Sequence, residues 1–175
     1  MKNLYTLLTA LVLIFNTQGN LLLAEGHADG DHGHSHHSHT PHSGVVAPFT
    51  NSGKKAGFLE LKLHDDKGDL ELWLTQKNGK TPFDLPLDSI FTVRFAELGN
   101  QAVQLQVRNT TTNEDEDGKA NIRGNKTHYF IFPGDTGVDA SFLVGKEFSS
   151  DVFVSFLVGG EAFTSSTFTL KPHTH

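Results

Sequence analysis

Alternation of apolar and polar residues is the dominant pattern in the longer, C-terminal part of this chain. Segments 58–63 and 70–74 have leucine at every second position, with Glu, Lys, Phe or Trp at the others, and the turn between them, 64–69, is polar and contains Gly68. Successive side chains of a strand point to opposite faces, so the alternation gathers the leucines on one face of each strand. Two such runs joined by a polar turn predict a β-hairpin.

Five more segments carry strand signals, and each is rich in β-branched or aromatic residues between Gly, Pro, Asn and Asp. They are residues 90–95, 102–107, 128–132, 151–158 and 162–170. Segment 141–148 is compatible with a helical turn or with an eighth strand. We therefore predict an all-β fold, an antiparallel immunoglobulin-like β-sandwich of about seven to eight strands. Phenylalanines and Trp73 are expected to fill its core.

The chain begins with Lys2 and an apolar run over residues 4–15, followed by a second short apolar stretch that ends at Ala24. Such runs are short for a membrane-spanning helix, which needs about 20 apolar residues. They predict a cleavable signal peptide over residues 1–24, with an uncleaved anchor as the alternative. Cleavage would make the protein periplasmic or secreted, without further contact with a membrane.

Histidine is concentrated directly after this signal. Of the eleven histidines, seven lie in one window: His27, His32, His34, His36, His37, His39 and His42. The window has no aliphatic residue larger than alanine, so it cannot build a core. We predict a disordered His-rich tail and linker over residues 25–55, a β-sandwich domain over residues 56–171, and a C-terminal His tail over residues 172–175.

Imidazole is the commonest protein ligand of transition metals, and a flexible chain can bring two to four closely spaced imidazoles to one ion. The window therefore predicts several overlapping, labile sites for Zn, Cu(II), Ni or Co. The preferred ligands are His32, His34, His36, His37 and His39, and the secondary ones are His27, His42, His173 and His175. The alternative is a solvated spacer or a pH-sensitive tail without a role in metal binding.

Two other histidines and one acidic loop are weaker candidates. His64 is expected to be a turn residue or a surface ligand, and His128 a structural residue at the start of a strand. A metal enzyme would require these two histidines to converge. Residues 113–118 match the opening of a calcium-binding loop, but Gly124 stands where a bidentate Glu is required. We expect a solvated hairpin loop there.

Composition narrows the chemistry further. The chain has no cysteine, and Met1 is its only methionine, so thiolate and thioether ligands for Cu(I) are missing from the predicted mature form. A formal net charge of −6 argues against nucleic acid as a partner. No nucleophile elbow, zinc-protease motif or phosphate-binding glycine loop occurs, so we do not expect an enzyme.

The signal, the Asp/Gly/His tail, the hairpin LELKLHDDKGDLELWL and a late strand–GG–strand ending in H-x-H together resemble small periplasmic proteins that accompany bacterial heavy-metal efflux systems. This resemblance implies metal binding or buffering in the periplasm, an efflux or other periplasmic partner protein, and no catalysis. Our leading hypothesis is an exported, non-enzymatic protein that captures or buffers divalent transition metals through its His-rich segment. The alternative is a structural or adhesive β-sandwich surface module whose tail is a spacer.

Overall fold

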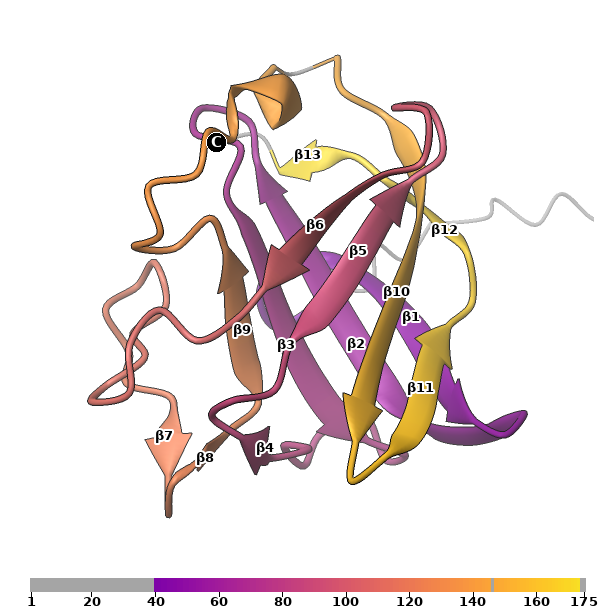
Figure 1. Cartoon of the computed structure of the whole chain (residues 1–175), viewed down its shortest axis with the longest axis vertical. Coiled ribbons are helices and arrows are strands. Elements are labelled where there is room, and N and C mark those ends of the chain that lie inside the picture. Colours follow the sequence, from indigo (N-terminus) through magenta and orange to yellow (C-terminus); the bar gives the residue numbers. More distant parts are fainter. Residues whose placement is uncertain (1–39, 146, 174–175) are drawn as a thin grey trace, which may run out of the picture. The chain divides into compact units, whose positions relative to one another are not determined.

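The computed structural model describes residues 40–145 and 147–173, and these are mainly antiparallel β structure (Figure 1). The strands, in chain order, are β1 Val45–Asn51, β2 Lys54–His64, β3 Leu70–Gln76, β4 Leu85–Pro86, β5 Phe91–Phe95, β6 Gln101–Leu105, β7 Ile122–Arg123, β8 Lys126–Thr127, β9 Tyr129–Phe132, β10 Ser150–Val158, β11 Glu161–Ser165, β12 Phe168–Leu170 and β13 Pro172–His173. Segment 141–148 was predicted to be either a helical turn or an eighth strand. Residues Ser141–Leu143 form a 3-10 turn, so the helical turn is confirmed. The predicted all-β antiparallel fold is confirmed. None of the helices in the described ranges has the length and apolar character needed to cross a membrane.

One continuous sheet wraps around the core in the order β6-β5-β10-β11-β1-β2-β3-β9. In Figure 1, β5, β6, β10 and β11 lie in front of β1, β2 and β3, which gives the two layers of the predicted sandwich. Antiparallel pairing of β1 with β11 joins the layers at one edge. At the other edge, two backbone hydrogen bonds of 2.8 and 3.0 Å link Gln106 and Ile131, so the sheet closes almost into a barrel.

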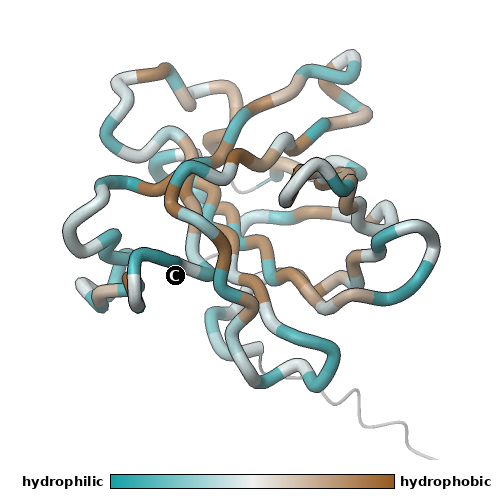
Figure 2. The backbone as a smooth tube through the Cα atoms, turned by 60° about the horizontal axis from the view of Figure 1, so that its bottom comes forward, coloured by the Kyte–Doolittle hydropathy of each residue, from teal (hydrophilic) through white to brown (hydrophobic). Residues whose placement is uncertain are grey.

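The β2–β3 hairpin has the register that the leucine alternation predicts. Its paired inner residues, each at most 1% exposed, are Leu59 with Leu74, Leu61 with Leu72, and Leu63 with Leu70. Phenylalanines of the other strands fill the space between the layers. Phe91 packs 4.4 Å, between ring centroids, from both Phe130 and Phe156. Figure 2 shows that hydrophobic residues are concentrated along the strands, whereas hydrophilic residues are common in the connecting loops.

The linker predicted up to residue 55 is wrong from Val45 onward. Residues 45–51 form β1, which is hydrogen-bonded between β11 and β2. Ala47 and Phe49 point into the core and are 2% and 0% exposed. Only these two inner positions are apolar and buried, and Pro48 separates them, which explains why the alternation was weak in the sequence. The folded domain therefore begins before the predicted boundary, whereas residues 25–39 lie outside the described residues.

The outer face of the β2–β3 hairpin departs most clearly from the expected solvated surface. Trp73 was predicted to belong to the sandwich core, but it forms a separate outer cluster with Tyr129 and Ile131. The charged and polar neighbours Glu60, Lys62, His64 and Glu71 on this face are also buried. The loop 106–121 and the segment before β1 supply their hydrogen-bond and ion-pair partners.

Candidate metal site on the outer face of the hairpin

Three side chains that could bind a metal converge near the turn of the hairpin. His64 is the last residue of β2, Glu71 is the second residue of β3, and Glu116 comes from the loop 106–121. The ligand atoms of all three lie within 4.8 Å of one another. The Nε2 atom of His64 is 2.9 Å from Oε2 of Glu71 and 3.1 Å from Oε2 of Glu116. One imidazole and two carboxylates are a ligand set suited to Zn(II) and related divalent ions.

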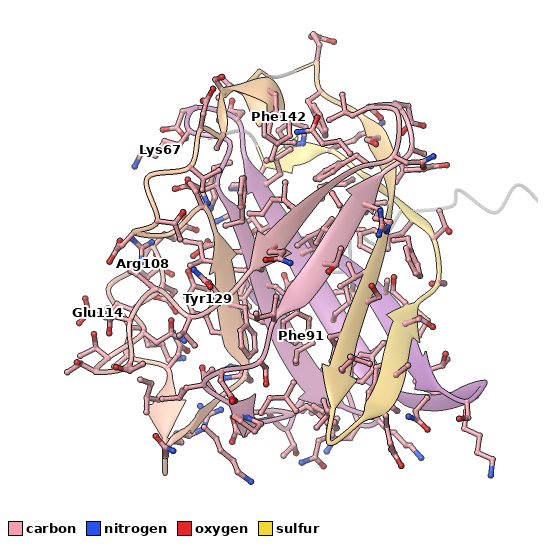
Figure 3. All side chains as sticks on the ribbon, viewed as in Figure 1. Lys67, Phe91, Arg108, Glu114, Tyr129 and Phe142 are labelled. Carbon is pink, nitrogen blue, oxygen red and sulfur yellow. The ribbon has the colours of Figure 1, made fainter. Side chains whose placement is uncertain are left out.

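Two of the three side chains of the cluster are buried, and the third is exposed to solvent. His64 and Glu71 are 6% and 1% exposed, whereas the side chain of Glu116 is 32% exposed. A polar cavity of about 320 Å³ borders all three residues. Figure 3 places Lys67, Arg108 and Glu114, which also line this cavity, along the side of the molecule next to β9. An ion could therefore enter from solvent past Glu116.

The side chain of Glu71 is an ionised carboxylate at neutral pH. Burial raises its pKa, but hydrogen bonds from His64 and Tyr129 outweigh burial, so the net pKa of Glu71 lies below its usual value. The hydroxyl of Tyr129 donates to Oε1 of Glu71 at 2.5 Å, and the backbone N–H of Glu116 donates to the same oxygen at 3.2 Å. Burial and the nearby Glu71 charge raise the pKa of Tyr129, which keeps its hydroxyl a donor. Such partners fix the orientation of a ligating carboxylate.

Lys62 supplies an internal cation at the same place. Its side chain is 6% exposed and its Nζ contacts Oε1 of Glu116. A buried ammonium group needs such a partner, because an unpaired charge is costly to remove from water. A divalent ion bound by Glu116 would therefore compete with Lys62 for this carboxylate.

The loop that carries Glu116 is folded onto β9, so the predicted solvated hairpin loop is wrong for its inner residues. Asn113 is 0% exposed; its Oδ1 accepts from the backbone N–H of Arg108, and its Nδ2 donates to the carbonyl of Tyr129, each at 2.9 Å. The carboxylate of Asp115 accepts from the backbone N–H of Lys119. These oxygens are committed to internal hydrogen bonds, so the loop does not present them as a calcium-binding set.

One of the two C-terminal histidines, His173, lies on a strand next to this cluster. Strand β13 runs parallel to β2, with His173 in register with His64. Registered residues of neighbouring strands carry their side chains on the same face of a sheet. His173, a predicted secondary ligand, is thus placed on the strand next to His64, whereas His175 lies outside the described residues.

His42 is the one predicted ligand of the tail window that falls within the described residues. Its ring stacks on Trp73, with centroids 3.9 Å apart and planes 1° from parallel. Burial lowers the pKa of His42, partly offset by the nearby Glu60 charge. His42 does not belong to the cluster of His64. The other predicted tail ligands, His27, His32, His34, His36, His37 and His39, lie outside the described residues, so their role stays a prediction.

The two remaining histidines occupy separate environments, contrary to what the enzyme alternative required. His64 is a buried strand end rather than a turn residue. His128 lies between β8 and β9, where its Nδ1 is 2.8 Å from the guanidinium of Arg123. Burial and the Arg123 charge lower the pKa of His128 to about 4. The two histidines line different cavities, so they form no common site.

Sequence reasoning missed Glu71 and Glu116 as partners of His64. A signal for Glu71 was present, because the hairpin register places it opposite Lys62 on the same outer face as His64. Glu116 had no comparable signal. Its loop has no periodic pattern, and only the folded chain brings it to the hairpin.

Comparison of the chain with protein-family models, with curated proteins and with solved structures finds no match. The resemblance to periplasmic metal-handling proteins therefore stays a prediction, and function has to be argued from the residues themselves.

Proposed function

We propose that the protein captures a divalent transition metal ion, and that His64, Glu71 and Glu116 form its binding site in the folded domain. The observation that carries this proposal is the convergence of one imidazole nitrogen and two carboxylate oxygens within 4.8 Å. Zn(II), Cu(II), Ni(II) and Co(II) all accept this mixture of nitrogen and oxygen ligands.

Binding involves three changes at the cluster. The Nε2 atom of His64 must be without its proton to coordinate a cation, so binding releases a proton whenever that nitrogen carries one. Glu71 contributes a carboxylate that is ionised at neutral pH. Lys62 gives up its contact with Glu116 and moves its ammonium group toward solvent. Affinity therefore falls as the medium is acidified, which gives a route for release.

In this proposal the His-rich segment supplies additional, labile sites, and the cluster supplies one site of fixed geometry. Six histidines outside the described residues would collect ions near an exported protein, and the folded domain would retain one of them. The role is capture or buffering without catalysis, in the periplasm or outside the cell. A metal-efflux protein is the kind of partner that such a role would serve.

Calorimetric titration of the full chain with Zn(II), Cu(II), Ni(II) and Co(II) tests the proposal. A variant in which the six tail histidines from His27 to His39 are replaced by Asn removes the tail sites and leaves the domain intact. We expect this variant to keep one equivalent of bound metal. Adding Glu71→Gln should weaken that remaining site at least tenfold, because an amide oxygen is a poorer ligand than a carboxylate.

Glu114→Gln in the same background is the matched control, since Glu114 lines the same cavity but is not part of the cluster. Its metal affinity should stay within about twofold of the tail variant, as expected for an exposed charge near the site. Complete loss of binding in the tail variant would refute the folded site. Equal losses from Glu71→Gln and Glu114→Gln would refute it as well, because the effect would then be one of general charge.

A further inference from the structure

A second cavity lies on the outer face of the β2–β3 hairpin, at the end away from the metal cluster. Its volume is about 540 Å³. Its walls include Trp73 and Phe58 from the hairpin and His42 from the segment before β1. We call residues 40–44 the strap, because they lie across the outer face of β2. The cavity combines an aromatic wall with a cationic rim.

The chain itself already places a planar ring on this aromatic wall. The imidazole of His42 lies 3.9 Å above the indole of Trp73 and parallel to it, and Trp73 is only 3% exposed. Backbone hydrogen bonds also hold the strap in position. The backbone N–H groups of His42 and Gly44 donate to Oε1 of Glu60 at 3.0 and 2.9 Å, so the imidazole can rotate away while the strap stays in place.

Trp73 also carries an unused hydrogen-bond donor. Its Nε1 is buried and has no hydrogen-bond partner among the described residues. Buried donors without a partner are rare in folded proteins and cost stability. A ligand that brings an acceptor atom to the indole would remove this cost.

The charges around the cavity favour an anion. Lys80, Lys119 and Arg123 line it; Arg123 is paired with the carboxylate of Asp84, whereas neither lysine forms an ion pair within residues 40–145 and 147–173. Glu60 is the one carboxylate among the described lining residues, and it is engaged by the strap. The rim is therefore cationic, although the chain as a whole has a net charge of −6.

We propose that this cavity binds a small planar aromatic anion. The ligand ring replaces the imidazole of His42 on Trp73, and its acidic group lies beside Lys119. His42 thus acts as a placeholder that keeps the aromatic wall covered when no ligand is bound. This site is separate from the metal cluster and does not rest on the proposed metal function.

Trp73 is the only tryptophan of the chain, so its fluorescence and its indole N–H resonance report on this cavity alone. Benzoate is a suitable probe, with benzamide as the uncharged ring and cyclohexanecarboxylate as the anion without an aromatic ring. The full chain is titrated in the presence of a chelator, so that metal binding does not contribute. We expect benzoate to shift both signals and to bind at least tenfold more tightly than either control compound.

Variants separate a placeholder from a structural wall. His42→Ala should tighten benzoate binding at least threefold, because it removes the competing ring, and Lys119→Gln should weaken it by a similar factor. Lys126→Gln on β8 is the matched control, since Lys126 does not line the cavity. Equal binding of the three compounds, an unchanged indole resonance or weaker binding by His42→Ala would each overturn the proposal.

Discussion

The two faces of the β2–β3 hairpin are both buried, but they are built from different chemistry. The inner face consists of six leucines, all at most 1% exposed. The outer face of the same strands carries Glu60, Lys62, His64 and Glu71, all at most 7% exposed. Burial of leucine needs no particular partner, whereas each buried charge needs a matched group at hydrogen-bond distance.

Every buried charge of the outer face has such a partner in a segment remote in sequence. Glu60 accepts from the strap, Lys62 contacts Glu116, and Glu71 accepts from Tyr129. Replacing buried ion pairs by apolar residues is often neutral or stabilising, so a face of this kind contributes little to stability relative to a leucine face. The comparison indicates that the inner face holds the fold together, whereas the outer face carries the groups of the proposed metal site.

The comparison would fail most visibly if the inner face were dispensable. Leu72→Ala should lower the free energy of unfolding by about 3 kcal/mol, since it removes a fully buried side chain and leaves a cavity. Denaturant unfolding measures this change. Metal affinity of the folded variant should be unchanged, and a stability loss below about 1 kcal/mol would contradict the assignment.

Substitution on the outer face should affect metal affinity strongly and stability only weakly. Glu71→Gln should lower the free energy of unfolding in the absence of metal by only about 1–2 kcal/mol, because the amide oxygen still accepts from Tyr129. Its metal affinity should fall at least tenfold, whereas Leu72→Ala should leave metal affinity unchanged. Denaturant unfolding measures the change in stability, and calorimetric titration measures the change in metal affinity. A loss of stability comparable with that of Leu72→Ala would remove the distinction between the faces.

Acid should affect the two faces differently, because the inner residues of the hairpin are leucines, whereas its outer face carries titratable side chains. The pKa of His128 falls from 6.5 to about 4 on folding, so the unfolded chain takes up the proton first. Stability from this group is complete above pH 6.5 and is lost as the pH falls from about 6.5 to about 4. For Glu71, whose pKa is lowered, the corresponding loss begins only below the ordinary glutamate pKa of 4.5.

We expect His128 to account for roughly 1–2 kcal/mol of this loss, less than the full pKa difference implies because its side chain is partly open to solvent. Unfolding curves of the native chain and of His128→Gln between pH 7 and about pH 4 test the sign and the size. Gln keeps an acceptor for Arg123 without titrating. Parallel pH profiles of the two proteins would show that His128 contributes nothing.

The smallest expected effect concerns the strap. A Cβ at Gly44 would lie 2.8 Å from the carbonyl oxygen of Leu61 and 2.9 Å from Cγ of Glu60. Gly44→Ala should therefore lift the strap, shift Trp73 emission to the red and destabilise the domain by about 1 kcal/mol. Fluorescence of the folded variant is the direct measurement, and an unchanged spectrum would mean that the strap adapts without moving His42.

Period-two alternation was sufficient to predict most of the longer strands, the β2–β3 hairpin and its leucine face, because these depend on local pattern alone. It failed at β1, where only Ala47 and Phe49 mark the inner face and Pro48 breaks the pattern. The 3-10 turn was foreseen as one of two alternatives. The small sheet of β4, β7 and β8, with two residues in each strand, is too short to leave a pattern.

The candidate site was only half visible in the sequence. The histidine pattern directed attention to the tail, and His64 was noticed but interpreted as a turn residue. Its burial depends on Glu116 in the loop 106–121, and the chemistry of Glu71 depends on Tyr129, which lies far along the chain. Such contacts follow from tertiary packing, which no local periodicity records.

The closure between β6 and β9 has a consequence for how the molecule moves. Each neighbouring pair along the main path of the sheet shares at least three registered residue pairs, whereas the closing edge is the single bridge between Gln106 and Ile131. Local unfolding of the domain should therefore begin at this closing edge. The backbone amides of Gln106 and Ile131 should be among the fastest of the sheet to exchange hydrogen for deuterium. The loop that leaves this edge carries Glu116, so the same local opening would withdraw one of the three groups of the proposed metal site and give a bound ion an exit while the leucine core stays intact.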